Sequence, residues 1–236
     1  MIRRALVTGG SGAIGAAICR KLAADGFEVI VHANTRLEAA QTIAREIGSQ
    51  FAVAFDVADA VESRKAIDAL LEAGPIQVLV NNAGTHDDAA FPAMRREQWQ
   101  GVIDVSLNGF FNVTQVLIMP MIRTRWGRVI NISSMTALAG NRGQVNYAAA
   151  KGAVNSATKA LALEVASRGI TVNAVAPGIV DAGMAGGTFD RATIERLVPM
   201  KRAGKASEVA ALVAFLVSDE AGYISGQVVS INGAMI

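Results

Sequence analysis

A single cysteine, Cys19, occurs in this chain of 236 residues, so no disulfide can form within the chain. We interpret Cys19 as a small core residue, because it falls in an expected helix and no catalytic partner is evident. Charged residues are also scarce, at 18%, and 22 basic against 20 acidic side chains give a formal net charge of +2. Because the basic residues are scattered rather than arranged in a stripe, the sequence gives no support for binding to nucleic acid.

A secretory signal and a membrane-spanning run are missing as well. Arg3 and Arg4 lead directly into a short strand, without the long apolar segment of a signal peptide. No apolar run approaches the length of a membrane span, so we expect no membrane contact and a cytoplasmic location. Hydrophobic residues still make up 52% of the chain, which is enough for a sizeable core and argues against disorder.

Short apolar segments alternate with amphipathic segments along the whole chain. The expected strands are rich in valine and isoleucine, which is typical of strands buried on both faces of a parallel sheet; they are Ala5–Thr8, Glu28–His32, Gln50–Phe55, Val78–Asn81, Arg128–Ser133, Thr171–Pro177 and Val228–Ile231. The expected helices are Ile14–Asp25, Leu37–Ile47, Ser63–Glu72, Glu97–Arg123, Asn146–Arg168, Arg191–Leu197 and Ser207–Ser218. This order predicts a single α/β domain over residues 1–236, a Rossmann fold with a doubly wound, seven-stranded parallel sheet flanked by helices.

Two of the expected helices, residues 97–123 and 146–168, are long and carry apolar or small residues on more than one face. One face of each is expected to pack on the sheet. The other face indicates a subunit interface, and we expect a homotetramer formed through these helices.

The segment that follows the sixth expected strand contains Gly183, Gly186 and Gly187 and shows no strong apolar period before Ile194. Ligands bind at strand ends in such folds, so we expect residues 183–204 to form a lid over the substrate. An ordinary surface loop is the alternative.

The first expected strand ends in a glycine-rich turn, Thr8-Gly9-Gly10-Ser11-Gly12-Ala13-Ile14-Gly15, which leads into a helix. Glycines let the backbone turn tightly and approach a pyrophosphate, and the helix N-terminus offers free N–H groups. The position at the first strand–helix junction strengthens this interpretation. The turn therefore predicts a dinucleotide site that includes Gly9, Ser11, Ala13, Ile14 and Gly15.

The second expected strand ends in His32-Ala33-Asn34-Thr35-Arg36, with no carboxylate before Glu38. A carboxylate at this place would accept hydrogen bonds from a ribose 2′-hydroxyl and repel a 2′-phosphate. Arg36 can instead pair with a phosphate, and Asn34 and Thr35 can donate to it, so the sequence favours NADP(H). Arg36 as a solvated residue of the next helix is the alternative, and His32 is interpreted as a strand-end residue without a role.

Acid–base chemistry is indicated by Tyr147, Lys151 and Ser134. Tyr147 and Lys151 are four residues apart, which places both side chains on one face of a helix. Ser134 stands at the end of an expected strand. A neighbouring cation favours phenolate over phenol, so the tyrosine proton becomes easier to transfer to an alkoxide.

Taken together, the ordered motifs resemble those of the short-chain dehydrogenase/reductase family over essentially the whole chain. The motifs are Thr8–Gly15, Asp56-Val57, Asn81-Asn82-Ala83-Gly84, Ser134, Tyr147-x-x-x-Lys151 and Pro177-Gly178. Within that family the chain is most similar to the 3-oxoacyl-acyl-carrier-protein reductases and the related acetoacetyl-CoA reductases, on the stretches 140–147 and 218–226.

The resemblance implies roles for the matching residues. Tyr147 would act as the general acid, Lys151 would lower its pKa and hold the nicotinamide ribose, and Ser134 would bond the substrate carbonyl. Asp56 and Val57 would hold the adenine. The central part of the cofactor and the nicotinamide would be lined by Asn82, Ala83, Gly84, Pro177, Gly178 and Ile179.

Three residues depart from the family pattern. Ala13 replaces the usual middle glycine of the turn, and Ala182 replaces a threonine that often contacts the nicotinamide. Ser106 stands where the family has a fourth catalytic residue, an asparagine that helps to position a water near the lysine. Ser106 could serve with a shorter reach; Asn108 is the less favoured alternative, because two residues along a helix turn a side chain to another face.

The resemblance implies NADPH-dependent reduction of 3-oxoacyl thioesters on an acyl carrier protein, in fatty-acid or aryl-polyene and polyketide-like biosynthesis. Arg125 and Arg168 match positions that contact the acidic carrier, although each could be a solvated helix-end cation. Arg142 could touch a phosphopantetheine arm or cap a loop. The alternatives are CoA thioesters or another small ketone or alcohol, and a catalytically inactive dinucleotide sensor.

One further polar run, His86-Asp87-Asp88, follows the Asn-Asn-Ala-Gly motif. Three adjacent residues cannot easily converge on one ion, so this run is interpreted as a solvated loop and no metal is expected.

Overall fold

The protein is described here from a computed structural model, which describes residues 2–181 and 190–236. Seven parallel strands form one sheet in the order β3-β2-β1-β4-β5-β6-β7, which confirms the predicted Rossmann architecture. The strands are β1 (Arg4–Val7), β2 (Glu28–Ala33), β3 (Ala52–Ala54), β4 (Val78–Asn81), β5 (Gly127–Ile132), β6 (Ile170–Pro177) and β7 (Val228–Ile231). The chain runs outward from β1 to β3 and then returns to β4 on the other side of β1, and this reversal leaves a crevice at the carboxyl ends of the central strands.

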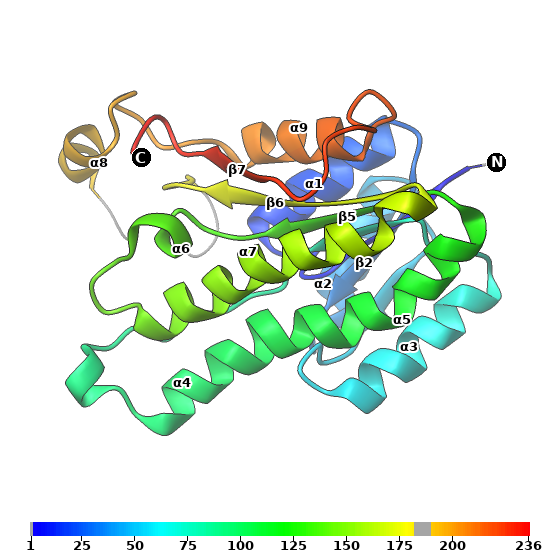
Figure 1. Ribbon diagram of the computed structural model, residues 1–236, viewed down its shortest axis with the longest axis horizontal. Helices are drawn as coiled ribbons and strands as arrows, with labels where there is room; N and C mark the ends of the chain where they lie inside the picture. Colours follow the sequence, from blue (N-terminus) through cyan, green and yellow to red (C-terminus); the bar gives the residue numbers. More distant parts are fainter. Residues whose placement is uncertain (1, 182–189) are drawn as a thin grey trace.

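The helices cover both faces of the sheet, because successive side chains of each strand point to opposite sides. Ala5 and Val7 of β1 belong to one apolar cluster, with residues of α1 (Ala13–Ala24), α2 (Leu37–Glu46) and α9 (Ala206–Val217). Leu6 belongs to the other, with residues of α3 (Ala60–Glu72), α5 (Gly109–Thr124) and α7 (Val145–Val165). Figure 1 shows α1 and α9 on one side of the sheet and α3, α5 and α7 on the other.

The expected helix at residues 97–123 is more irregular than its pattern predicts. It consists of α4 (Arg96–Ile103), a π-helical turn (Asp104–Asn108) and α5, which follow one another without a break. Two short elements have no counterpart in the prediction, namely a 3₁₀ turn (Phe91–Ala93) and α6 (Thr136–Ala139). The π turn contains Ser106, which is its buried residue.

The whole stretch Arg96–Thr124 is long and apolar enough to cross a membrane by length and composition. The prediction that no segment reaches this length is therefore wrong by that measure. The stretch runs alongside α3 and α7 (Figure 1), and Val113, Leu117 and Met121 are buried in the core. These contacts favour a core helix of the α/β fold.

Candidate active site

A cleft of about 430 Å³ opens at the carboxyl ends of the strands. Its walls come from the start of α1, the loop after β4, the segment between β5 and α6, the start of α7 and the loop after β6. The predicted site residues that line it are Ile14, Asn82, Gly84, Ser134, Tyr147, Lys151, Pro177, Gly178 and Ile179. The structure thus brings together residues from five separate parts of the sequence.

Tyr147 and Lys151 lie one turn apart near the start of α7, as their spacing predicts. The Lys151 Nζ donates to the Ile132 carbonyl oxygen at 2.8 Å and lies 5.8 Å from the centre of the Tyr147 ring. Ser134 follows directly after β5, and its Oγ accepts a hydrogen bond from the Thr136 N–H at 3.1 Å. A phenol, a hydroxyl and an ammonium group therefore meet on one wall of the cleft.

Burial has the largest effect on the proton affinities of this group. It raises the pKa of Tyr147 above its ordinary value; the Ser134 hydroxyl lowers that pKa in part, and the charge of Asp88 raises it. Burial also lowers the pKa of Lys151 to about 8. The expected lowering of the tyrosine pKa by Lys151 is not found, because the Nζ is turned to the Ile132 carbonyl and the desolvation of the phenol dominates. The phenol keeps its proton at neutral pH, which suits a proton donor.

Ser106 and Asn108, the two candidates for the fourth catalytic position, both lie in the π-helical turn and differ in burial. Ser106 is only 4% exposed, and its Oγ has no hydrogen-bond partner among the residues that the structure describes. Asn108 is exposed, and its Nδ2 donates to Asp104 Oδ1 at 2.7 Å. A Cβ added to Gly84 would lie 3.2 Å from the Lys151 Nζ and 3.7 Å from the Ser106 Oγ, so these two polar groups converge beneath Gly84.

A second, much smaller cavity lies beside these groups. Its volume of about 10 Å³ corresponds to one water molecule, and its lining includes Thr8, Asn81, Ser106 and Lys151. Each of these residues has a side chain that can hydrogen-bond to water. The space next to Ser106 is therefore polar and of the size that a bridging water requires.

The glycine-rich turn has the geometry that a pyrophosphate needs. Gly9 has a φ of +61°, and a Cβ on Gly15 would come within 2.2 Å of the Gly9 carbonyl oxygen, so no side chain fits there. The N-cap of α1 is Gly12, which provides no side-chain cap, so the first N–H groups of the helix are free for an anion. Ala13 is accommodated as the first residue of α1. These features fit a dinucleotide.

The residues predicted to select NADP(H) lie at the start of α2. Asn34, Thr35 and Arg36 are all exposed, and Arg36 is the N-cap residue of the helix. Within residues 2–181 and 190–236, the Arg36 guanidinium takes part in no ion pair or hydrogen bond. It is therefore available to a phosphate group.

The adenine-binding residues predicted from the resemblance follow β3. Asp56 Oδ1 accepts a hydrogen bond from the Ala58 N–H at 2.9 Å, which shapes the segment. Val57 is 4% exposed and packs close to Gly109 of α5. This segment is held in a defined conformation next to the end of β2.

His32 occupies a place that its sequence context did not predict. The ring is 1% exposed; Nδ1 accepts a hydrogen bond from the Gly9 N–H at 3.0 Å, and Nε2 lies 2.9 Å from the Phe55 carbonyl oxygen. Burial lowers the pKa of His32 to about 4, so the ring is neutral. The sequence signal for the role of His32 is its polar ring at the end of a buried strand, beside a glycine-rich turn.

Arg125 and Arg168 are not brought to the cleft. Arg125 precedes β5 and Arg168 precedes β6, whereas the cleft lies beyond the other ends of these strands. The eight-residue strand β6 separates Arg168 from the cleft by roughly 25 Å. Within one chain, the two arginines therefore lie at the opposite end of the sheet from the cleft.

Part of the expected lid is described. Residues 183–189, together with Ala182, lie outside the described residues. The remainder includes α8 (Arg191–Leu197), whose Leu197 lines the cleft.

The side chains of the run His86-Asp87-Asp88 do not converge on one point but bond to different partners. Asp88 contacts His86 at 3.1 Å and accepts from Gln144, whereas Asp87 accepts from Gln98. In the described part of the chain, no group of three or more His, Cys, Asp or Glu residues has a geometry that could hold a metal ion.

Comparisons with known proteins agree with this geometry. A family described as Enoyl-(Acyl carrier protein) reductase matches residues 9–235. The chain is 42% identical to a 3-oxoacyl-(acyl-carrier-protein) reductase FabG of Aggregatibacter actinomycetemcomitans, over 98% of both chains. It is 42% identical to a protein of that name from Staphylococcus aureus, over 100% of this chain and 98% of the other. It is also 44% identical to Nodulation protein G of Azospirillum brasilense, over 98% of this chain and 97% of the other.

Proposed function

The chain belongs to the short-chain dehydrogenase/reductase family, an oxidoreductase group acting on CH–OH, and we propose that it reduces 3-oxoacyl thioesters on an acyl carrier protein with NADPH. The observation that carries this proposal is the meeting of Ser134, Tyr147 and the buried Lys151 in a cleft beside the glycine-rich turn. Relatives named 3-oxoacyl-(acyl-carrier-protein) reductase support the substrate class, within fatty-acid or related aryl-polyene and polyketide-like biosynthesis.

NADPH, when bound, supplies the hydride. Ser134 holds the substrate carbonyl oxygen by donating a hydrogen bond to it, and Tyr147 gives its proton to that oxygen as negative charge develops. The raised pKa keeps the phenol protonated until this moment. Lys151 places a positive charge beneath the same group and is positioned to return a proton to Tyr147.

Ser106 completes this proton path through one water in the small cavity that it shares with Lys151. A serine side chain is shorter than that of asparagine, and a single bridging water spans the remaining distance. The hydroxyl without a partner and the buried Lys151 Nζ would both be satisfied by that water.

The exposed start of α2 supports NADPH over NADH. The Arg36 guanidinium and the Asn34 and Thr35 side chains would receive the 2′-phosphate that distinguishes the two cofactors. No carboxylate stands at the end of β2 to repel it.

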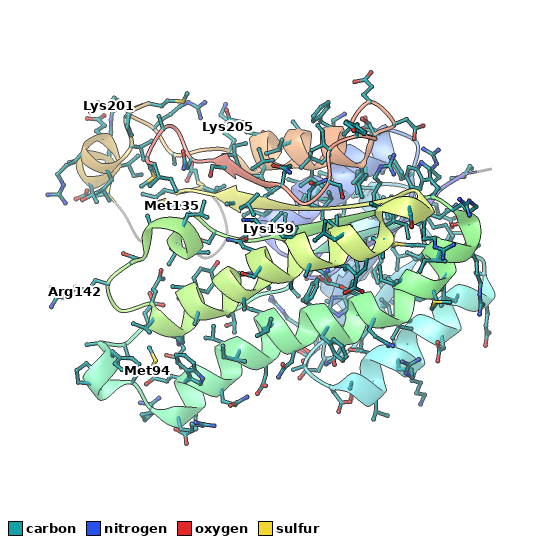
Figure 2. All side chains as sticks on the ribbon, in the orientation of Figure 1. Met94, Met135, Arg142, Lys159, Lys201 and Lys205 are labelled. Atoms are coloured by element: carbon teal, nitrogen blue, oxygen red, sulfur yellow. The ribbon has the colours of Figure 1, made fainter. Side chains whose placement is uncertain are left out.

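For Arg125 and Arg168, the proposed contact with a carrier at the cleft is made across a subunit interface, by a second copy of the chain. Phe111 and Met119 on α5 and Leu163 on α7 are more than half exposed, which supports the proposed homotetramer through these helices. A copy packed in the opposite direction on α5 and α7 would carry the two arginines toward the cleft. Within one chain, the exposed Arg142 lies next to Asn141, which lines the cleft, and it points outward from the loop between α6 and α7 (Figure 2).

The proposal is tested by following NADPH absorbance with a panel of substrates, in a soluble preparation as expected for a cytoplasmic protein. Acetoacetyl-carrier protein is expected to be consumed much faster than acetoacetyl-CoA or simple ketones. Faster turnover of the CoA thioester would favour the alternative substrate class. NADPH binding without turnover of any ketone or alcohol would favour a dinucleotide sensor and contradict the proposal.

A further inference from the structure

Two side chains hold Gly9 from opposite sides of β1. His32 stands in β2, and Asn82 follows β4; these are the two strands that flank β1 in the sheet. The Gly9 N–H donates to His32 Nδ1 at 3.0 Å, and Asn82 Nδ2 donates to the Gly9 carbonyl oxygen at 3.0 Å. Gly9 is the first glycine of the glycine-rich turn and has a left-handed φ of +61°. Both backbone polar groups of Gly9 are therefore fixed by side chains.

The hydrogen bond from Gly9 determines which tautomer His32 adopts. An N–H group can only donate, so Nδ1 must be the acceptor and the ring proton must reside on Nε2. Nε2 then donates to the Phe55 carbonyl oxygen, 2.9 Å away. Phe55 directly precedes Asp56 and Val57, and its ring lies 4.2 Å from the imidazole ring.

A single neutral imidazole thus joins two segments that would hold different parts of a dinucleotide. One segment is the turn at the pyrophosphate, and the other is the strand end at the adenine. The bond to Phe55 is buried and the bond from Gly9 is partly buried, and the ring itself is only 1% exposed, so loss of the ring removes both bonds from a site with little access to water.

We propose that His32 is a positioning residue for the dinucleotide, which sets the distance and orientation between the glycine-rich turn and the adenine-binding segment. The inference rests on the proposed dinucleotide-dependent function. It concerns the parts that NADPH and NADH share, so His32 supports the binding of both cofactors equally. Arg36, in contrast, acts on the 2′-phosphate alone.

The test is a direct titration of NADPH and of NADH by cofactor fluorescence, with variants that separate the two bonds. In His32→Asn, the amide oxygen occupies the place of Nδ1 and can still accept from Gly9. In His32→Gln, the longer amide reaches the place of Nε2 and keeps only the bond to Phe55. His32→Phe retains an aromatic ring and loses both bonds.

We expect His32→Phe to weaken NADPH and NADH by the same factor, about 10-fold, because the partly buried Gly9 N–H and the buried Phe55 carbonyl oxygen both lose their partner. His32→Asn should stay within about 3-fold of the unmodified protein, and His32→Gln should resemble His32→Phe. Ile18→Val is the matched control: it removes one buried methyl group from the adjoining apolar cluster, and both dissociation constants should change less than about 2-fold.

Amide hydrogen exchange provides a readout that does not depend on the cofactor. The Gly9 amide should exchange slowly in the unmodified protein and in His32→Asn, and rapidly in His32→Gln and His32→Phe. Unchanged cofactor binding in His32→Phe, or equal weakening in the asparagine and glutamine variants, would overturn the inference while leaving the proposed function intact. If the unmodified protein bound neither dinucleotide, the proposed function would fail and this inference with it.

Discussion

The polar side chains at the two ends of the sheet differ in how far their hydrogen bonds are satisfied within the protein. At the amino ends of the strands, Arg4 is 5% exposed, and its guanidinium bonds to Glu28 and to the carbonyl oxygens of Leu70 and Gly74. At the carboxyl ends, the Ser106 hydroxyl has no protein partner in the described chain, and the buried Lys151 Nζ bonds to one carbonyl oxygen. At the first end Arg4 Nη2 and Thr171 Oγ1 also lack a partner in the described chain, but Arg4 is anchored by three other hydrogen bonds, whereas the groups at the second end line cavities that a ligand or a water can enter.

This difference has an energetic cause. A buried polar group without a partner is unfavourable by about 1–3 kcal/mol, so a fold retains such groups only where something else selects for them. Substitutions at the amino ends should therefore change stability with little effect on chemistry. Substitutions at the carboxyl ends should change chemistry with little loss of stability.

The largest effect is expected for Tyr147→Phe. Removal of the proton donor should lower the turnover number by about 10³-fold, within the range found for general acids. NADPH affinity and the unfolding temperature should stay close to those of the unmodified protein. Stopped-flow kinetics and cofactor titration measure the two quantities, and a turnover number within 10-fold of normal would remove Tyr147 from its role.

A fall in pH should destabilise the folded protein because His32, at the carboxyl end of β2, is buried in its neutral form. Its pKa is lowered to about 4 in the folded protein, so the unfolded chain takes up a proton first as the pH falls below about 6.5. The free energy of unfolding therefore has its full value above that pH and falls by about 3 kcal/mol between about pH 6.5 and 4. The charge of Asp56 raises the pKa of His32 and limits this loss. Urea unfolding across this range should show a steeper pH dependence for the unmodified protein than for His32→Asn; equal slopes would argue against a neutral buried ring.

Arg4→Met examines the other end of the sheet. The substitution leaves the Leu70 and Gly74 carbonyl oxygens without their partner and should lower the free energy of unfolding by about 2 kcal/mol. Turnover per folded molecule should not change. A reduced turnover number at normal stability would break the distinction between the two ends.

Arg36→Ala should weaken NADPH by about 10-fold and leave NADH nearly unchanged, because only the 2′-phosphate is affected. Arg45→Ala is the matched control on the same helix, since Arg45 is exposed in its last turn and should affect neither cofactor. Equal losses for NADPH and NADH would exclude Arg36 from the phosphate site.

The smallest effect is expected for Ser106→Ala, with a turnover number about 3- to 10-fold lower. Unfolding should be unchanged or slightly less favourable, because the variant removes a buried hydroxyl without a partner. Ser106→Asn should recover turnover if its longer side chain replaces the water. A profile of turnover against pH that is identical in all three proteins would show that Ser106 takes no part in proton supply.

The sequence predicted the regular parts of the fold and the residues of the cleft, because both have strong local signals. Buried parallel strands are continuous apolar runs, and the glycine-rich turn and the Tyr147–Lys151 spacing depend on neighbouring residues.

The features that escaped prediction depend on distant parts of the chain. The π-helical turn interrupts a segment that was expected to be a regular helix, although the burial of Ser106 and the exposure of Asn108 agree with the predicted preference for Ser106. His32 gains its place from Gly9 and Phe55, each 23 residues away in the sequence. The position of Arg125 and Arg168 at the far end of the sheet follows from strand direction, which matching of single positions does not take into account.

Isotope tracing offers the most direct measurement of the central claim, reduction of a 3-oxo group in the cleft. The protein would be incubated with NADPH that is deuterated at the reactive C4 position, together with an equal mixture of 3-oxoacyl and 2-enoyl thioesters of the carrier. We predict that deuterium appears on C3 of a 3-hydroxyacyl product, and that Tyr147→Phe slows this incorporation by about 10³-fold. Deuterium in a saturated acyl product, or consumption of NADPH without transfer of the label, would contradict the claim.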